Sequence, residues 1–296
     1  ASMGANAVLS AAGIPHISPT SSAPSLSNST TYPGFFRLIS SDALQGQALA
    51  DAVAGLSTPG TNYSDPAIVY MDNAQGVGMA DAFEDTWTAM GNSLCTSMSY
   101  NQQSTSDYSS LAQAVVDDGC DSAVLISYEY DGVQLLEELS NQGFTGQIFG
   151  SESLSHLTEN DFSDPGAADG MITTRWSEFT HPSERYDLFS EICANITACD
   201  SGIYVEEAYD AVSIAGEAAL LAMHYSNNLS LEDSIRYVGY EWDGASSLIT
   251  FNEDGDVAGN GFDVYEHEYH SGNNTLSQWF QYHWLPDFSF EPVSDL

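Results

Sequence analysis

From residue 42 onward, apolar runs of strand length alternate with longer segments in which apolar residues recur at helical spacing. This alternation is typical of a parallel sheet covered by helices on both faces, because each parallel strand needs a crossover segment that returns the chain. The predicted strands cover residues 67–71, 94–99, 122–127, 147–150 and 171–174, and the predicted helices cover residues 43–56, 78–90, 109–118 and 132–142. The fold class is therefore α/β, and right-handed crossovers make the sheet doubly wound.

Two more helices are predicted after that alternation, at residues 183–194 and from residue 204 to about residue 225. In the second of them apolar side chains occupy a wide face, which predicts a helix that is largely buried. The members of that face are Ala208, Ala211, Val212, Ile214, Ala215, Ala218, Ala219, Leu221 and Ala222.

The C-terminal region contains two apolar runs, at residues 248–251 and 261–265, on either side of the acidic segment 252–256. The pattern predicts two strands joined by a tight turn. The acidic segment could also be interpreted as a calcium loop. However, Val257 stands where the EF-hand pattern requires glycine, so the turn is the better interpretation.

The charge balance excludes two classes of partner. The chain has 42 Asp and Glu residues against four Arg and no Lys, and its formal net charge is -38. Nucleic acid and anionic membrane surfaces are excluded because both require clustered cations. Self-repulsion should destabilise the folded chain in ordinary buffer, whereas molar salt, with a Debye length of about 3 Å, would screen it. The composition favours a high-salt or acidic-proteome host, and an acidic surface without salt adaptation is the alternative.

Four cysteines allow three pairings and are too few for a disulfide-scaffolded domain. Cys193 and Cys199 are the predicted pair, since they lie six residues apart where a helical pattern ends and the chain could turn back. Cys95 and Cys120 each lie just before or within a strand-like run and could equally be buried thiols. No metal site is predicted, because C-x-x-C spacing is missing and the His-Glu-Tyr-His cluster at 267–270 has the wrong spacing for H-E-x-x-H.

Three side chains suited to a small polar ligand each lie just beyond a predicted strand, namely Gln75, Tyr128 and Glu152. In open α/β sheets, ligands bind at the carboxyl ends of the strands. These three residues therefore converge on one sheet edge by topology. A zwitterionic amino acid needs an anionic acceptor for its ammonium group, donors for its carboxylate and a wall for its side chain.

A hydroxyl-rich turn offers further ligand-binding groups. Thr20, Ser21 and Ser22 follow the apolar run at residues 14–17, so several hydroxyls and backbone N–H groups are offered where a strand ends. A solvated Ser/Thr-rich loop is the alternative interpretation.

The order of these segments resembles the type I periplasmic binding proteins of the branched-chain amino acid (Leu/Ile/Val-binding) transport family. The resemblance is carried by ISPTSSAPSLS at 17–27, FFRLISSDALQGQALA at 35–50, NAQG at 73–76, ISY at 126–128, FGSE at 149–152, residues 204–210 and ITFNEDGD at 249–256. It implies two doubly wound α/β lobes, with residues 42–175 forming lobe two and residues 249–296 forming hinge-crossing strands and a tail. Residues 1–41 and 176–248 would form lobe one, which is expected to be incomplete because family members begin with a β-α-β-α-β segment before the equivalent of residue 1.

The resemblance also implies roles for the candidate site residues. Glu152 aligns with the family's ammonium-binding glutamate, and Ser22 with a hydroxyl residue that contacts the ammonium and the carboxylate. Thr20 and Ser21 align with neighbours that contribute backbone groups.

Tyr128 and Tyr204 align with aromatic walls of the ligand pocket. Gln75 stands where an aromatic residue often lines that pocket, which favours a polar or amide-bearing ligand over a purely aliphatic one. Asp210 and Arg37 are interpreted as structural residues, the first in helix packing and hydrogen bonding and the second in an ion pair.

The function that the resemblance implies is that of an extracytoplasmic solute-binding protein of an ABC importer, whose lobes close on an amino acid or related amide. Its second partner would be a membrane permease, and no cofactor is expected. The location would be periplasmic, cell-surface anchored or secreted, with the signal segment not present in this chain. An amide- or urea-binding protein and the ligand-binding domain of a sensory receptor are the alternatives. An enzyme is not predicted, since G-x-S-x-G, a phosphate loop with Lys and a strand-linked G-x-G-x-x-G are missing from the sequence.

Overall fold

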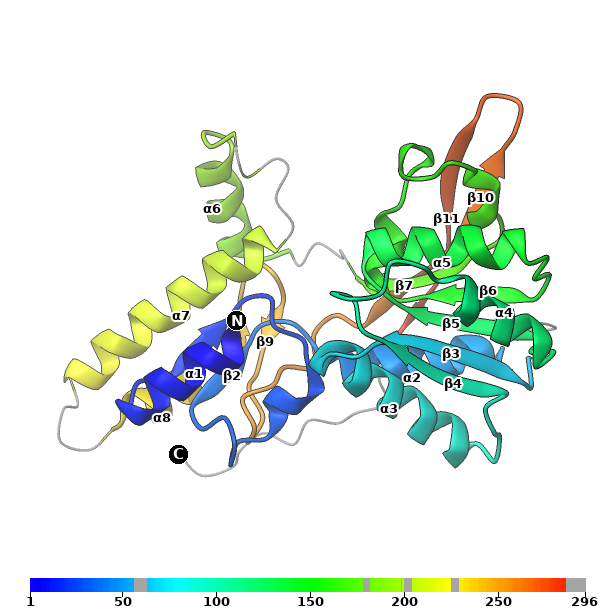
Figure 1. Cartoon of the computed structure of the whole chain (residues 1–296). Coiled ribbons are helices and arrows are strands. Elements are labelled where there is room, and N and C mark those ends of the chain that lie inside the picture. The colour runs from blue at the N-terminus through cyan, green and yellow to red at the C-terminus, as the bar shows by residue number, and fades with distance from the viewer. Residues whose placement is uncertain (56–62, 178–181, 198, 200–203, 225–228, 286–296) are drawn as a thin grey trace. The chain divides into compact units, whose positions relative to one another are not determined.

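The computed structural model describes the chain except residues 56–62, 178–181, 198, 200–203, 225–228 and 286–296 (Figure 1). The described residues form two compact units. The first contains the described parts of Ala1–Ser41 and Glu178–Asn260, and the second contains those of Asp42–Ser177 and Gly261–Leu285. Residues 249–260 thus belong to the first unit and residues 261–285 to the second, where the resemblance implied one C-terminal segment.

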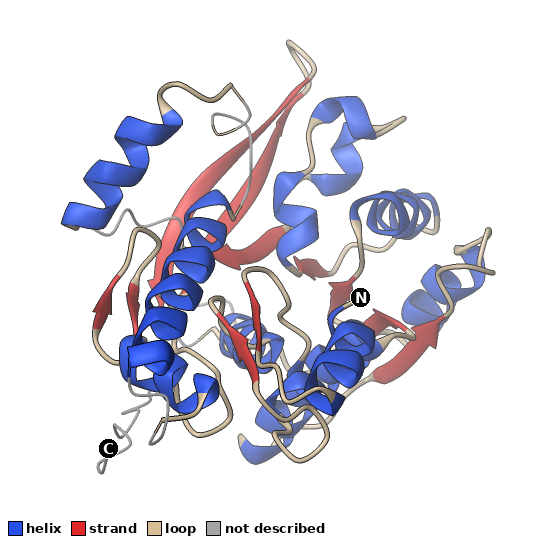
Figure 2. Ribbon diagram, turned by 90° about the vertical axis from the view of Figure 1, so that its left-hand side faces the viewer, coloured by secondary structure: helices blue, strands red, loops and turns tan. Residues whose placement is uncertain are grey.

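The second unit is built on a seven-stranded sheet with the order β11-β10-β7-β6-β5-β3-β4. Its strands are β3 (Pro66–Met71), β4 (Thr96–Tyr100), β5 (Ser122–Ile126), β6 (Gln147–Gly150), β7 (Ile172–Trp176), β10 (Phe262–His270) and β11 (Thr275–Trp284). The strands from β4 to β7 in this order are parallel, and the long β10–β11 hairpin adds two antiparallel strands at one edge (Figure 2). All five predicted strands are present, and the α/β prediction is confirmed.

Helices cover both faces of this sheet, since alternate residues of each strand enter different cores. Val69 and Leu125 pack with residues of α4 and α5, whereas Ile68 and Val124 pack with residues of α2 and α3. Figure 1 shows these two pairs of helices on opposite sides of the strands. The helices are α2 (Asp42–Val53), α3 (Ala74–Ala89), α4 (Ser109–Asp117) and α5 (Glu129–Asn141), with the 3-10 turns η2 (Glu152–His156), η3 (Glu159–Asp161) and η4 (Pro165–Ala168). The sheet is therefore doubly wound.

The first unit has little sheet among its described residues. Strands β1 and β2 form a parallel pair, and β8 and β9 form an antiparallel pair. Its core joins Phe36 and Leu38 to Ile214 and Phe251. Its elements are α1 (Ser2–Ala11), β1 (His16–Ser18), η1 (Pro24–Ser27), β2 (Phe35–Arg37), α6 (Glu184–Cys193), α7 (Val205–His224), α8 (Leu231–Val238), β8 (Trp242–Asp243) and β9 (Leu248–Ile249).

Two predictions for the C-terminal half need correction. The runs at 248–251 and 261–265 do contain strands on either side of a turn, but they do not pair with each other, because β9 pairs with β8 while β10 pairs with β7 and β11 in the other unit. Helix α7 is not largely buried, since Val212 is 74% exposed while Ile214 is completely buried. The described residues pack against only one face of α7, and an alanine-rich pattern does not distinguish that face from the others.

Both cysteine pairs are joined. Cys193 and Cys199 form a disulfide with an S–S distance of 2.20 Å at the end of α6. Cys95 and Cys120, for which buried thiols were the alternative, form a second disulfide of 2.04 Å. That bond links the segment before β4 to the segment before β5.

None of the helices formed by the described residues is both long and apolar enough to cross a bilayer.

Candidate ligand-binding site

The carboxyl ends of three neighbouring strands carry the candidate residues of the second unit. Strands β3, β5 and β6 are adjacent and parallel, so the segments that follow them emerge at one edge of the sheet. The Tyr128 hydroxyl, after β5, donates a hydrogen bond of 2.9 Å to Oε1 of Gln75, after β3. The structure thus brings together two residues that lie 53 positions apart in the sequence.

The position of Gln75 is fixed by the turn that leads from β3 into α3. Oδ1 of Asn73 accepts hydrogen bonds from the backbone N–H groups of Gln75 at 3.0 Å and of Gly76 at 2.9 Å, which caps the helix. A Cβ on Gly76 would lie 2.2 Å from the carbonyl oxygen of Met71, so only glycine permits this close turn. Gln75 therefore sits on a rigid helix start.

Tyr128 is the residue before α5, and its side chain is 37% exposed. Burial raises the pKa of its hydroxyl, and the negative charge of Asp42 raises it further. The hydroxyl therefore stays protonated at neutral pH and donates to Gln75. Asp42 is completely buried at the start of α2, and its place beside this site was not predicted. Its only sequence signal is a position at the head of a helical pattern.

Glu152 begins η2, directly after β6, and is half-buried. The backbone N–H of Ser151 donates to the carbonyl of Leu125 at 3.1 Å, which extends the pairing of β5 and β6 to the residue before Glu152. The structure thus places Glu152 beyond the strand that neighbours the strand of Tyr128.

A buried carboxylate lies beneath the start of α5. Asp131 is 2% exposed and accepts hydrogen bonds from the hydroxyls of Tyr108 at 2.9 Å and Tyr100 at 3.4 Å. Burial raises the pKa of both tyrosines, and the nearby Asp131 charge raises it further. These contacts hold the first turn of α5, and hence Tyr128, against the sheet. No spacing in the sequence marked the three residues as a group.

The hydroxyl-rich turn folds back on β1. Ser18 Oγ accepts hydrogen bonds from the backbone N–H groups of Ser21 at 3.1 Å and Thr20 at 3.4 Å. The Ser21 hydroxyl also lies 2.6 Å from the hydroxyl of Ser2, and Ser22 is half-buried. Thr20 is exposed, and such local bonds also occur in ordinary Ser-rich turns, so the ligand-binding role of this turn stays a prediction.

Tyr204 also belongs to the first unit, where it is the half-buried residue before α7. Its φ angle is +63°, a left-handed conformation that bulky residues rarely adopt and that other contacts must sustain. Gln75, Tyr128 and Glu152, in contrast, belong to the second unit.

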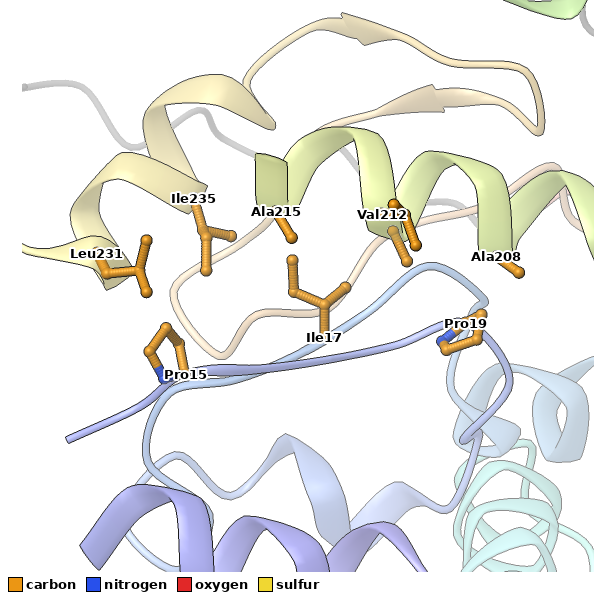
Figure 3. Close-up of a pocket in the computed structure, with 9 residues that line it drawn as sticks. Pro15, Ile17, Pro19, Ala208, Val212, Ala215, Leu231 and Ile235 are labelled. Atoms are coloured by element: carbon orange, nitrogen blue, oxygen red, sulfur yellow. The ribbon is translucent and has the colours of Figure 1, made fainter. Parts of the chain in front are cut away.

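An apolar pocket of about 360 Å³ lies within the first unit (Figure 3). Its lining residues are Pro15, Ile17, Pro19, Ala208, Ala211, Val212, Ala215, Leu231 and Ile235. Figure 3 shows Ile17 of β1 pointing toward α7 and α8. Because all nine residues are apolar, they offer no side-chain partner for an ammonium or carboxylate group, and the pocket is not the candidate site for a zwitterion.

Comparison with known proteins supports a binding protein. Residues 1–269 match the family model described as the receptor family ligand binding region. A comparison with curated protein sequences finds no match.

Three solved structures have a similar fold. A leucine binding protein from Thermotoga maritima has a TM-score of 0.73 at 18% identity, covering 95% of this chain and 76% of that one. An ABC transporter substrate-binding protein from Desulfitobacterium hafniense in complex with Leu has a TM-score of 0.66 at 21% identity, covering 94% and 77%. A putative branched-chain amino acid ABC transporter protein from Rhodospirillum rubrum has a TM-score of 0.63 at 19% identity, covering 89% and 73%.

Proposed function

Because the chain belongs to the family of receptor ligand-binding regions and has the fold of type I periplasmic binding proteins, we propose that it is the extracytoplasmic solute-binding protein of an ABC importer for an amino acid or a related amide. The observation that carries the proposal is the arrangement of Gln75, Tyr128 and Glu152 beyond three adjacent parallel strands. Ligands of open α/β sheets bind at this edge.

The chemistry of the candidate residues suits a zwitterion. The carboxylate of Glu152 would accept hydrogen bonds from the ammonium group, and the ring of Tyr128 would form a wall of the ligand pocket. Thr20, Ser21 and Ser22 are proposed to donate to the carboxylate, and Tyr204 is proposed as the second aromatic wall. These roles are the ones that the family resemblance implies.

Gln75 bears on specificity. Its Oε1 accepts a hydrogen bond from the hydroxyl of Tyr128. Its amide nitrogen is therefore the group that would donate a hydrogen bond to a ligand side chain. A carbonyl or carboxamide on the ligand matches that donor, and an aliphatic side chain would leave the amide nitrogen unpaired on desolvation. We therefore favour a ligand such as glutamine over leucine.

The test is a thermal-shift screen in molar salt against the standard amino acids, simple amides and urea, repeated with Glu152→Gln. A ligand at a hundred times its dissociation constant adds about 2.7 kcal/mol of stability, which is a readily measured shift. Loss of charge-assisted bonds of about 1.5–3 kcal/mol should weaken binding of an amino acid by roughly 10- to 150-fold. The matched control is Glu129→Gln, an exposed glutamate next to Tyr128, which should leave the affinity unchanged.

The possible results separate the candidates. A shift with amino acids that Glu152→Gln reduces, while Glu129→Gln does not, supports the amino-acid ligand and the ammonium site. A shift with urea or amides alone supports the amide-binding alternative. If the folded wild-type protein responds to no compound, the proposal is wrong.

A sensory ligand-binding domain is the second candidate, favoured by the receptor description of the matching family. Uptake of the radiolabelled hit by cells with and without the gene distinguishes the two. Loss of uptake supports the importer, whereas normal uptake with loss of a ligand-dependent response supports the sensory role.

A further inference from the structure

Arg37 is the one completely buried residue among the four arginines, all of which are described. Its guanidinium group donates in several directions from β2. Nε donates to Oδ1 of Asp256 at 2.6 Å, and Nη1 donates to the backbone carbonyls of Ser22 at 2.8 Å and Ala23 at 3.1 Å. Nη2 donates to the hydroxyl of Ser27. Three of these four contacts are made to residues 22–27, which continue the hydroxyl-rich turn.

The acidic turn at residues 252–256 supports the other side of this arginine. Oδ1 of Asn252 accepts the backbone N–H groups of Asp254 and Asp256, each at 2.9 Å, which fixes the turn. Gly255 has a φ angle of +82°, and a Cβ there would lie 2.1 Å from the carbonyl oxygen of Phe35. The turn is therefore pressed against β2 at a position that only glycine can occupy.

The same turn contacts the hydroxyl-rich segment directly. The hydroxyl of Ser29 donates to Oδ1 of Asp254 at 2.8 Å, and the carboxylate of Asp256 is engaged by Arg37. Both acidic side chains thus have protein donors. This explains an acidic sequence that looked like a calcium loop: two of its three carboxylates, those of Asp254 and Asp256, bind a serine and an arginine of the same unit.

From these contacts we propose that Arg37 and the turn 252–256 form a clamp that positions Thr20, Ser21 and Ser22 for ligand binding. This rests on the proposed function. Arg37 is a positioning residue, because it holds the backbone of Ser22 and Ala23 from beneath. Since Asp256 neutralises Arg37, the clamp sets the geometry of the turn and adds no net charge. The guanidinium fork is essential, because its five N–H donors serve two carbonyls, a hydroxyl and a carboxylate at once, whereas an ammonium group has three donors.

The test uses Arg37→Lys and Asp256→Asn in the full chain. Dissociation constants are measured for L-glutamine and L-leucine, together with hydrogen exchange of residues 19–27 in the unliganded protein. We expect at least tenfold weaker binding of the probe that binds the wild type, and faster exchange across the segment. Arg37→Lys keeps the charge but loses the fork, and Asp256→Asn keeps an acceptor but loses the charge, so either variant can report if the other fails to fold.

The matched control is Asp210→Asn. Asp210 is a completely buried carboxylate of the first unit that accepts hydrogen bonds from the backbone N–H groups of Ala245 at 2.9 Å and Ser246 at 2.8 Å. This variant should lose stability without a change in affinity or in exchange of residues 19–27. A merely structural role for Arg37 predicts the same behaviour for all three variants.

Each result separates this inference from the proposed function. Unchanged exchange at residues 19–27 in both clamp variants overturns the clamp. Faster exchange with unchanged affinity overturns its role in ligand binding, and the proposed function then stands if Glu152→Gln still weakens binding. If the wild type binds neither probe nor any compound of the screen, the proposed function fails and the clamp's role in binding fails with it.

Discussion

Single residues in this chain show how a protein with very few cations uses them. Arg37 is buried among a carboxylate and backbone carbonyls, whereas Arg236 forms a half-exposed pair with Glu232 at 3.3 Å. Surface pairs of the second kind contribute about 0–1 kcal/mol. Removing one partner of a buried pair costs about 3–5 kcal/mol, because it leaves an uncompensated charge. The interpretation of Arg37 as an ion-pair partner was available from its scarcity, but Asp256 was not identifiable as its partner 219 positions away.

His267 provides a pH-dependence prediction at the same scale. It is completely buried on β10, with Nε2 3.2 Å from Oγ1 of Thr173, and burial lowers its pKa to about 4. In the unfolded chain the group protonates near pH 6.5, so between about pH 6.5 and 4 the unfolded state binds more protons. Stability should therefore fall as the pH falls through that window, by up to about 3 kcal/mol for this residue.

The measurement is denaturant unfolding of wild type and His267→Gln at pH 7, 5.5 and 4.5 in molar salt. The difference in free energy of unfolding between the two proteins should shift in favour of the variant as the pH falls. His270→Gln, at a half-buried histidine three residues further along β10, is the control and should track the wild type. A difference between wild type and His267→Gln that is constant over the three pH values contradicts the argument.

Individual elements could be predicted where the local sequence has the residue pattern typical of that element. The run of residues 122–126 begins at Ser122, continues with four apolar residues and is completely buried, as a central parallel strand requires. In the first unit, the acidic segment 252–256 does form a turn. Two features were predicted wrongly: which strands pair with β9 and β10, and how much of helix α7 is buried. The partners of β9 and β10 depend on distant strands, and the seven positions of α7 between 208 and 222 that are Ala or Gly offer little contrast between a buried and an exposed face.

Helix α7 allows a direct test of that asymmetry. Ile214→Ala removes a completely buried side chain and should cost about 2–5 kcal/mol, the usual range for such a cavity. Val212→Ala alters a side chain that is 74% exposed and should cost within about 0.5 kcal/mol. Urea unfolding in molar salt measures both. Equal, large costs would mean that the face carrying Val212 is covered in the folded protein, contrary to the structure of the first unit.

At the scale of the whole molecule, strand order and net charge are the two properties that matter. The candidate residues at one sheet edge could be predicted because strand order places them there, whereas Asp42 and the Asp131 cluster could not, since neither has a distinctive spacing. The formal net charge of -38, in contrast, is a property of the whole chain and not of any local pattern. At this scale mutual repulsion opposes compaction, and only ions from solution can screen it.

Stability should therefore rise with salt. Raising sodium chloride from 0.1 to 2 M shortens the Debye length from about 10 Å to less than about 3 Å, so repulsion between surface carboxylates is largely removed. Relief of about 2–3 kcal/mol would raise Tm by roughly 4–12 °C, at about 2–4 °C per kcal/mol for a chain of this size class. Calorimetry in sodium chloride, with sucrose of equal osmolality as the control, separates screening from exclusion of solute from the protein surface. If sucrose raises Tm as much as the salt does, charge is not the cause. If Tm rises in neither solution, the acidic surface is not an adaptation to high salt.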